Sequence, residues 1–278
     1  MAIASVNGIQ IHYRQEGAGP LLLLLHGWPQ TGHCWRHLVG PLSRAYTVVV
    51  PDLRGYGRSD LPTWGHDKRT KAEDLHRLIR ALGHESATVI GHDRGARVAH
   101  RWALDHPGDV ERLVVMDIIP TREMWRRMDA NLARGTWHWL FHLQPDLPEL
   151  LAGANTGAYL RFLIDNWSHV PLPEADIAEY VRAFERPGAL RAGFDDYRAA
   201  FPVDAEHDDA DFGRKITMPL LALWGEHSFL QSIDALEVWR EYADDVTGTV
   251  IEDCGHFLAE ERPPAVLDEL RAFLPREV

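Results

Sequence analysis

The sequence has little of what secreted, membrane-spanning or nucleic-acid-binding proteins need. Its two cysteines, Cys34 and Cys254, form no C-x-x-C pattern, which favours a reducing compartment. The longest leucine run, Leu21–Leu25, is too short to span a bilayer, and Met1–Asn7 lacks the basic flank and apolar core of a signal peptide. The net charge of −12 argues against a nucleic-acid or anionic membrane partner. We therefore expect a cytoplasmic protein.

Metal-binding spacings are also absent, because neither H-E-x-x-H nor C-x-x-C occurs. We interpret most of the 16 histidines as surface or structural residues and expect neither a metal nor an organic cofactor. No repeat or low-complexity linker is present. What is present is a chain of 278 residues, 45% hydrophobic, which is long enough for one substantial core plus a lid.

Short apolar runs of the kind found in buried parallel strands recur along the chain. Gly8–Tyr13 alternates as an edge strand should, and helical patterns such as Lys71–Leu82 and Ala96–Leu104 separate several of the runs. The alternation predicts an α/β fold, with a mostly parallel sheet and helices on both faces. The runs are Leu21–Leu25, Tyr46–Val50, Ala87–Ile90, Arg112–Met116, Leu220–Trp224 and Thr249–Ile251.

The strand signal stops between about Thr121 and Phe212, where tryptophan, proline and helical spacings take over. We interpret residues 121–212 as a helical cap domain, inserted after the strand that ends at Asp117. Residues 1–120 and 213–278 would then form the core domain. In such folds the active site lies at the carboxyl ends of the strands, where the cap would roof it.

The most informative segment is Gly-His-Asp-Arg-Gly-Ala-Arg, residues 91–97, between a predicted strand and a predicted helix. Gly91-x-Asp93-x-Gly95 has the pattern of a nucleophile elbow, with an aspartate where serine is more usual. A carboxylate that attacks a saturated carbon leaves an ester, which water can open, whereas serine would leave a stable ether. Asp93 therefore indicates displacement at an sp3 carbon. The competing interpretation is an aspartate that caps the following helix.

Other catalytic parts are predicted at strand ends. The backbone N–H groups of Trp28 and Arg94 are placed to form an oxyanion hole. His256 follows the last strand and is the candidate general base. An acid must orient this histidine, and Asp117 is our choice, with Glu226 as the rival after a neighbouring strand.

Arg94 and Arg97 lie three residues apart at the start of the helix, so they can face the same side. Cations at a helix N-terminus oppose the helix dipole, which suggests a function that offsets the cost. Two guanidinium groups can bind a carboxylate, so we expect a small acid as substrate. The alternative is that both pair with acidic residues of this acidic chain.

With these residues the chain resembles the fluoroacetate dehalogenases, a haloacid-specific branch of the α/β-hydrolases, from roughly His26 to His256. The motif at 91–97 is typical of this branch, because haloalkane dehalogenases typically carry tryptophan after the nucleophile. The resemblance implies a homodimer that hydrolyses haloacetates without a cofactor. It also implies the roles of five residues: Asp93 as nucleophile, His256 as base, Asp117 as its partner, and Arg94 and Arg97 as carboxylate ligands.

The cap of that family carries a His-Trp pair and a tyrosine that hold the departing halide. They match His138, Trp139 and Tyr197, and another pocket tryptophan matches Trp167. The chain departs from the family at Trp28, where members often have phenylalanine. We expect the larger ring to narrow or reshape the pocket.

The expected function is therefore hydrolytic dehalogenation of short 2-halo acids, namely haloacetates including fluoroacetate, to a 2-hydroxy acid and halide through an aspartyl-ester intermediate. An epoxide hydrolase is the main alternative, because it shares the Asp–His–acid apparatus and uses two cap tyrosines; Tyr159, Tyr180 and Tyr197 are candidates. A ligand-binding receptor with little turnover is a second alternative. A serine esterase is disfavoured because no serine occupies the elbow.

Overall fold

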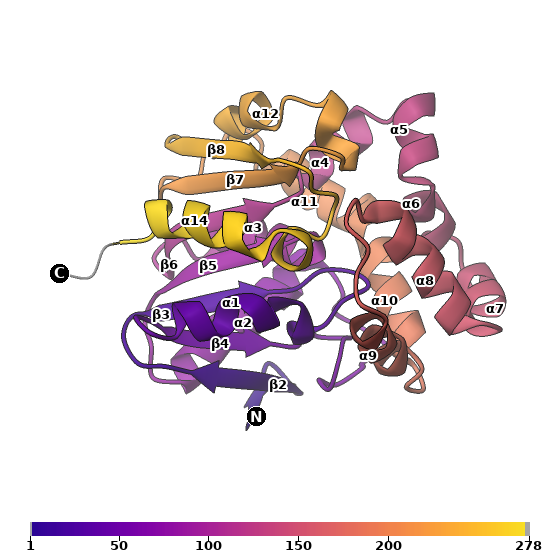
Figure 1. Ribbon diagram of the computed structural model, residues 1–278, viewed down its shortest axis with the longest axis horizontal. Helices are drawn as coiled ribbons and strands as arrows, with labels where there is room; N and C mark the ends of the chain where they lie inside the picture. The colour runs from indigo at the N-terminus through magenta and orange to yellow at the C-terminus, as the bar shows by residue number, and fades with distance from the viewer. Residues whose placement is uncertain (1, 276–278) are drawn as a thin grey trace.

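The computed structural model describes residues 2–275 and is built on one eight-stranded sheet (Figure 1). The strands lie in the order β1-β2-β4-β3-β5-β6-β7-β8. The β1–β2 and β2–β4 pairs are antiparallel, and every pair from β4–β3 onward is parallel. The strands are β1 (Ala2–Val6), β2 (Ile9–Glu16), β3 (Leu21–Leu25), β4 (Thr47–Pro51), β5 (Ala87–His92), β6 (Val110–Met116), β7 (Leu220–Gly225) and β8 (Val246–Ile251).

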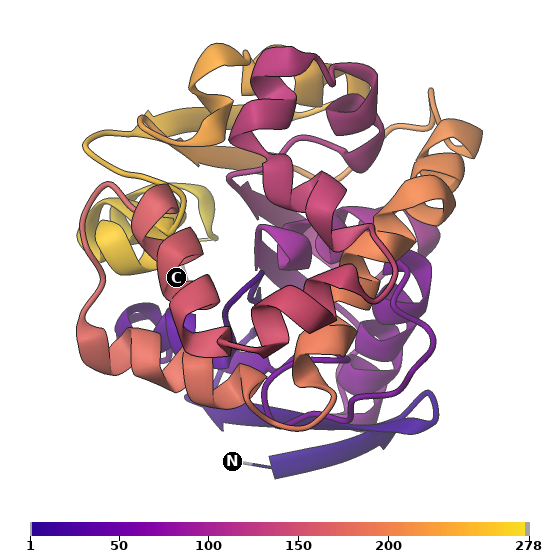
Figure 2. The same ribbon diagram turned by 90° about the vertical axis from the view of Figure 1, so that its right-hand side faces the viewer.

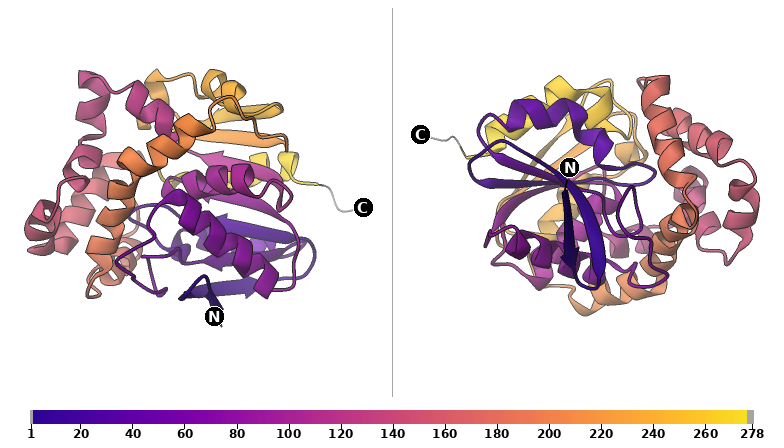
Figure 3. Two further views of the ribbon diagram at one scale, coloured as in Figure 1. Left: turned by 180° about the vertical axis from the view of Figure 1, so that it is seen from behind. Right: turned by 90° about the horizontal axis from the view of Figure 1, so that it is seen from below.

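Helices cover both faces of the sheet, as the sequence predicted. On one face lie α1 (Arg36–Leu42) and α14 (Pro263–Phe273) (Figure 1). The opposite face carries α2 (Lys68–Ala81) and α3 (Arg94–Asp105), as the view from behind shows (Figure 3). Helix α12 (Ala235–Tyr242) lies beside α3. Both faces are covered, so the five leucines of β3 are all buried and show no alternation.

Local sequence signals explain where α2 begins. The Asp67 side chain accepts a hydrogen bond from the Thr70 backbone N–H and so caps the helix. The helix then buries one apolar stripe against the sheet, which includes Leu75, Leu78 and Ile79. The N-cap position of α3 is different, because its residue is Asp93 and makes no side-chain capping bond.

A group of helices lies between β6 and β7 and stands at one end of the sheet, facing the viewer in Figure 2. The group ends with a π-helical turn at Ala200–Asp204 and the helix that follows it. Its helices are α4 (Thr121–Arg126), α5 (Ala130–Gly135), α6 (Trp137–His142), α7 (Leu147–Gly153), α8 (Thr156–Trp167), α9 (Glu174–Phe184), α10 (Ala189–Ala199) and α11 (Ala205–Ala210). Short helices also occur at Gly32–Trp35, Phe229–Ser232 and, as α13, Leu258–Glu261.

The predicted strands all occur, with ends that differ by up to three residues, but β1 was not predicted. It pairs with β2 through a two-residue Asn7-Gly8 turn, in which both residues have positive φ. Asn-Gly is the preferred sequence for such a turn, because its backbone twist matches the twist of the flanking strands. Among residues 2–275, no helix has the length and apolar character needed to cross a bilayer.

Candidate active site

The elbow between β5 and α3 holds Asp93 in a strained backbone conformation, with φ 47° and ψ −119°. The glycines beside it permit this close crossing of strand and helix. A Cβ on Gly91 would lie 2.5 Å from the Ala96 Cα, and one on Gly95 would lie 2.4 Å from the His26 carbonyl oxygen. Since the side chain of Asp93 does not cap α3, the capping interpretation is wrong.

The carboxylate of Asp93 is held by a backbone donor. One oxygen, Oδ1, accepts a 2.8 Å hydrogen bond from the Trp28 backbone N–H, whereas Oδ2 lies on the side of His256. Burial alone would raise the pKa of Asp93, but positive charge at His256 and neighbouring groups, with the Trp28 N–H, lowers it. Trp28 therefore contributes the predicted backbone donor at this position. The companion donor from Arg94 stays a prediction.

His256 lies beside the nucleophile and is oriented by Asp117. Its Nδ1 atom lies 2.6 Å from Asp117 Oδ2, and its Nε2 atom lies 3.9 Å from Asp93 Oδ2. Burial lowers the pKa of His256, but the hydrogen bond and charge of Asp117, with the charge of Asp93, raise it overall. The rival Glu226 is exposed and accepts a hydrogen bond from the Asp253 N–H instead.

The loop that carries His256 is fixed by Glu261, a residue that the sequence analysis missed. This buried carboxylate accepts four backbone N–H bonds of 2.8 Å, from Gly255, Phe257, His169 and Val170. It thereby joins the base loop to the segment between α8 and α9. Its bonds go to backbone atoms up to 92 residues away, so no side-chain motif signalled it.

A cavity of about 180 Å³ opens above these groups. Its buried floor includes Asp93, Arg97 and His256, and its exposed lining residues mark the opening. The cavity brings together most of the predicted site residues from both the core and the inserted helices. Its lining consists of Asp93, Arg97, Gly135, Thr136, His138, Trp139, Asn166, Trp167, Tyr197, His227, Ser228, Phe229, Gln231 and His256.

Arg97 is a buried cation with spare hydrogen-bonding capacity. Its Nη1 atom donates to the Ile119 carbonyl oxygen at 2.8 Å and to Thr121 Oγ1 at 3.3 Å. Nε and Nη2 have no partner among the described residues, although the side chain is only 2% exposed. Burial, followed by the charge of Arg94, lowers the pKa of Arg97 to about 10. A buried donor without a partner is costly, which favours an anionic ligand here.

Arg94 is oriented differently from Arg97. It is fully buried and does not line the cavity, because its guanidinium pairs with Asp196 of α10. Nη2 lies 2.6 Å from Asp196 Oδ1, and the group stacks 4.4 Å from the Tyr197 ring centroid. Asp196 also binds Lys68 and Lys71, so three cations converge on one buried carboxylate. Arg94 therefore pairs with an acidic residue, which was the alternative considered from the sequence. Its direct contact with substrate stays a prediction.

Three groups that can donate a hydrogen bond come from the inserted helices: His138 and Trp139 from α6, and Tyr197 from α10. Burial lowers the pKa of His138 to about 3, so the imidazole is neutral. Its Nδ1 atom is buried without a partner. Burial and the charge of Asp93 raise the pKa of Tyr197 well above its ordinary value, so the hydroxyl keeps its proton. All three groups are therefore neutral donors.

Of the two other tryptophans predicted at the site, Trp167 lines the cavity and Trp28 does not. Trp167 lines the cavity and lies beside His138, with ring centroids 4.5 Å apart. Trp28 does not line the cavity, so its ring does not form the narrowing that we expected. The Trp28 ring packs instead on Phe184 and lies against Gly193. A Cβ on Gly193 would lie 2.2 Å from Trp28 Cζ3, so the ring occupies space that a side chain there would fill.

The two other candidate tyrosines lie outside the cavity lining. The hydroxyl of Tyr159 lies 2.5 Å from His142 Nε2. The hydroxyl of Tyr180 donates a 2.9 Å hydrogen bond to Glu260. Tyr197 is therefore the one tyrosine among the described lining residues, and the pair of tyrosines considered for an epoxide hydrolase is not assembled.

Comparison with known proteins shows the family and agrees with the fold. Residues 20–263 match the family model for the α/β-hydrolase fold. The chain is 39% identical to a soluble epoxide hydrolase of Corynebacterium sp. (strain C12), covering 98% of this chain and 96% of the relative. It is 36% identical to a fluoroacetate dehalogenase of Burkholderia sp., covering 98% and 92% respectively. The structure of the epoxide hydrolase CorEH superimposes with a TM-score of 0.91 at 37% identity, covering 98% of this chain and 97% of that one. The protein is therefore a hydrolase with the α/β-hydrolase fold and belongs to the α/β-hydrolase family.

Proposed function

We propose that this hydrolase cleaves the carbon–halogen bond of short 2-halo acids, fluoroacetate included, to give a 2-hydroxy acid and halide. The observation that carries the proposal is Arg97, a buried guanidinium with two unpartnered N–H-bearing nitrogens in the same cavity as Asp93. A carboxylate substrate supplies the missing acceptors and the missing charge. A neutral substrate supplies no such charge.

In the first step Asp93 Oδ2 attacks the α-carbon of the bound acid. A carbon–oxygen bond forms as the carbon–halogen bond breaks, and the halide leaves with the bonding electron pair. His138, Trp139 and Tyr197 receive it as neutral hydrogen-bond donors. Fluoride is small and strongly hydrated, so these donors replace the water that it would otherwise need. By analogy with oxyanion-hole donors, each of the three donors stabilises the transition state by roughly 2–4 kcal/mol.

In the second step His256 removes a proton from water, and the resulting hydroxide adds to Cγ of the Asp93 ester. The negative oxygen that forms is stabilised by the Trp28 N–H, with the Arg94 N–H as the predicted second donor. Collapse of this intermediate breaks the ester bond, and His256 returns its proton to the departing alkoxide. The second proton of the water, left on the Asp93 carboxyl, is then released to solvent, which restores the carboxylate. Asp117 stabilises the imidazolium in between.

The two steps are coupled through charge. The negative charge of Asp93 contributes to raising the pKa of His256 in the resting enzyme. Esterification removes that charge, so the pKa of His256 falls at the stage where a neutral base is required. The mechanism needs no metal or organic cofactor, and we expect it to operate in the cytoplasm.

An epoxide hydrolase is the second candidate, and the 39% identity to a soluble epoxide hydrolase favours it. His138 and Tyr197 would then donate to the epoxide oxygen in place of two tyrosines. An epoxide is neutral, however, so it would supply no negative charge to pair with the guanidinium of Arg97.

Parallel assays separate the two functions. The wild-type protein is incubated with fluoroacetate, chloroacetate and styrene oxide, and released fluoride, chloride and diol are measured. We expect halide from both acids and little diol. Efficient diol formation without halide release would reject the dehalogenase and support the epoxide hydrolase.

A further inference from the structure

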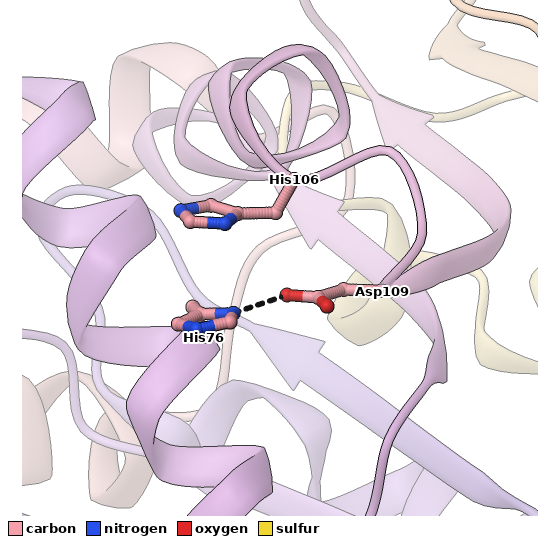
Figure 4. Close-up of side chains that lie close together, drawn as sticks. All are labelled: His76, His106 and Asp109. Carbon is pink, nitrogen blue, oxygen red and sulfur yellow. Dashed lines mark hydrogen bonds and ion pairs between the residues drawn. The ribbon is translucent and has the colours of Figure 1, made fainter.

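Three groups of histidine and carboxylate side chains among the described residues bring their ligand atoms within 4.8 Å of one another. One consists of His76, His106 and Asp109, with the two rings stacked 4.2 Å apart (Figure 4). Its carboxylate is already committed, because Asp109 pairs with Arg80 at 2.7 Å and accepts from Trp102 Nε1 at 2.9 Å. A cation would have to displace this network, which disfavours metal binding by that group.

A second group, His169, His227 and Asp253, differs because its side chains are exposed. The His169 and His227 rings stack 3.9 Å apart at 21°, and Asp253 completes the set. His227 also lines the catalytic cavity, where exposed lining residues mark the opening. The group therefore lies at the mouth of the active site.

The backbone that carries this group is held in place. Glu261 binds the N–H groups of His169 and Gly255, and the His227 N–H donates to the Cys254 carbonyl at 2.9 Å. The three ligands thus come from three loops that are joined by hydrogen bonds: one between α8 and α9, one after β7 and one after β8. A preformed frame of this kind lowers the entropy cost of binding a ligand.

The local charge also suits a cation. Asp253 and the neighbouring Glu226 supply two exposed carboxylates, and Glu226 Oε2 lies 3.7 Å from His227 Nε2. Arg262 opposes this charge, with its Nη2 atom 3.7 Å from Asp253 Oδ2. Two imidazoles and one carboxylate are a ligand set that Zn²⁺ accepts, with water in the fourth position.

We propose that His169, His227 and Asp253 form a binding site for Zn²⁺ or a similar divalent transition metal, and that an ion there slows passage through the cavity mouth. The ion would tie the segment after α8 to the two core loops, one of which carries His256. It would also hold a hydrated cation beside the lining residue His227. The site goes beyond the proposed function, because binding does not depend on which substrate is hydrolysed.

The test is calorimetric titration of the full-length, chelator-treated protein with ZnCl₂. We expect one tight site in the wild type, weakened at least about tenfold by His169→Asn or Asp253→Asn, because each removes one of three ligands. His76→Asn is the matched control and should leave this affinity unchanged. Both cysteines are buried, so their thiols do not compete.

Equal Zn²⁺ affinity in the wild type and His169→Asn would overturn the site, as would loss of the tight site in His76→Asn. The proposed effect on passage through the cavity mouth is tested by turnover of whichever substrate proves active. Zn²⁺ should lower kcat/KM in the wild type, EDTA should restore it, and His169→Asn should keep its metal-free kcat/KM when Zn²⁺ is added. Tight binding with no change in kcat/KM would contradict the effect on passage.

Discussion

The core and the inserted helices contribute different groups to one cavity and hold them by different means. In the core, Asp93 and Asp117 stand at strand ends with φ 47° and 54°, and their backbone N–H groups bond to the neighbouring strand ends at 3.1 and 2.8 Å. In the helical region, ring packing positions His138, Trp139 and Tyr197. The ring centroid of Tyr197 lies 5.7 Å from that of His138 and 5.9 Å from that of Trp139.

In the proposed mechanism this difference matches a division of roles. The sheet fixes the groups that would make and break bonds, whereas the helical region supplies the donors that would bind the leaving group. Asp196 connects the two regions, because it comes from α10 and binds Arg94 of α3 and Lys71 of α2. If the roles divide in this way, changes in the core should abolish the reaction, and changes in the helices should only reduce it or shift the preference among halides.

The largest effect is expected in the core. Asp93→Asn removes the nucleophile, and we expect kcat to fall by about 10⁴-fold or more, as in other enzymes that lose a covalent catalyst. Halide release under saturating substrate measures it. Glu226→Gln is the control and should retain most of the activity, since Glu226 does not contact His256. Substantial turnover by Asp93→Asn would break the comparison.

Arg97 is the next test. Arg97→Gln removes the charge that faces the substrate carboxylate, which is expected to cost about 2–5 kcal/mol, or roughly 30- to 4,000-fold in kcat/KM. Arg97→Lys should recover part of the loss, because it restores the charge without the planar fork. Circular dichroism controls for folding. Unchanged kcat/KM for haloacetates would remove the main support for an acidic substrate.

Tyr197→Phe tests the helical region. Loss of one donor to the leaving halide should lower fluoroacetate turnover by about 10- to 1,000-fold and bromoacetate turnover by less, since fluoride depends most on hydrogen bonds. Tyr159→Phe is the matched control, because its hydroxyl lies outside the cavity. An equal loss for both halides would mean that Tyr197 does not bind the leaving group.

The smallest effect is the pH dependence. His256 must be neutral to act as a base, and Asp117 raises its pKa. The rate of ester hydrolysis should therefore decline up to tenfold per pH unit below the pKa that His256 has in the ester intermediate. Asp117→Asn removes the group that raises the pKa, so the acidic limb should move to lower pH while the maximal rate falls. Pre-steady-state halide release and product formation separate the two steps. A limb unmoved by Asp117→Asn would mean that another group titrates.

The sequence predicted the core site because each catalytic residue follows an apolar run that could only be a buried strand. This rule placed Asp93 and His256, and it narrowed the supporting acid to Asp117 or Glu226; the contact of Asp117 with His256 decides between these two. His138 and Tyr197 could not, since helical aromatic residues usually pack in cores and only the family resemblance singled them out.

Other features depended on contacts that no local pattern encodes. Asp196 lies 102 residues from Arg94 in the sequence and binds its guanidinium. The position of Arg94 at the start of the helix had suggested that this guanidinium faces the substrate. The residues of the proposed zinc site, His169, His227 and Asp253, are likewise scattered over three loops. The β1–β2 hairpin, in contrast, carried a readable Asn7-Gly8 signal that the strand analysis passed over.

The central claim is that Asp93 forms an ester with the α-carbon of the substrate, which His256 then helps to hydrolyse. The direct test is mass spectrometry of the His256→Asn variant after incubation with chloroacetate. The account predicts a carboxymethyl group on the peptide that contains Asp93, together with one equivalent of released chloride. Unmodified protein with sustained chloride release would contradict it.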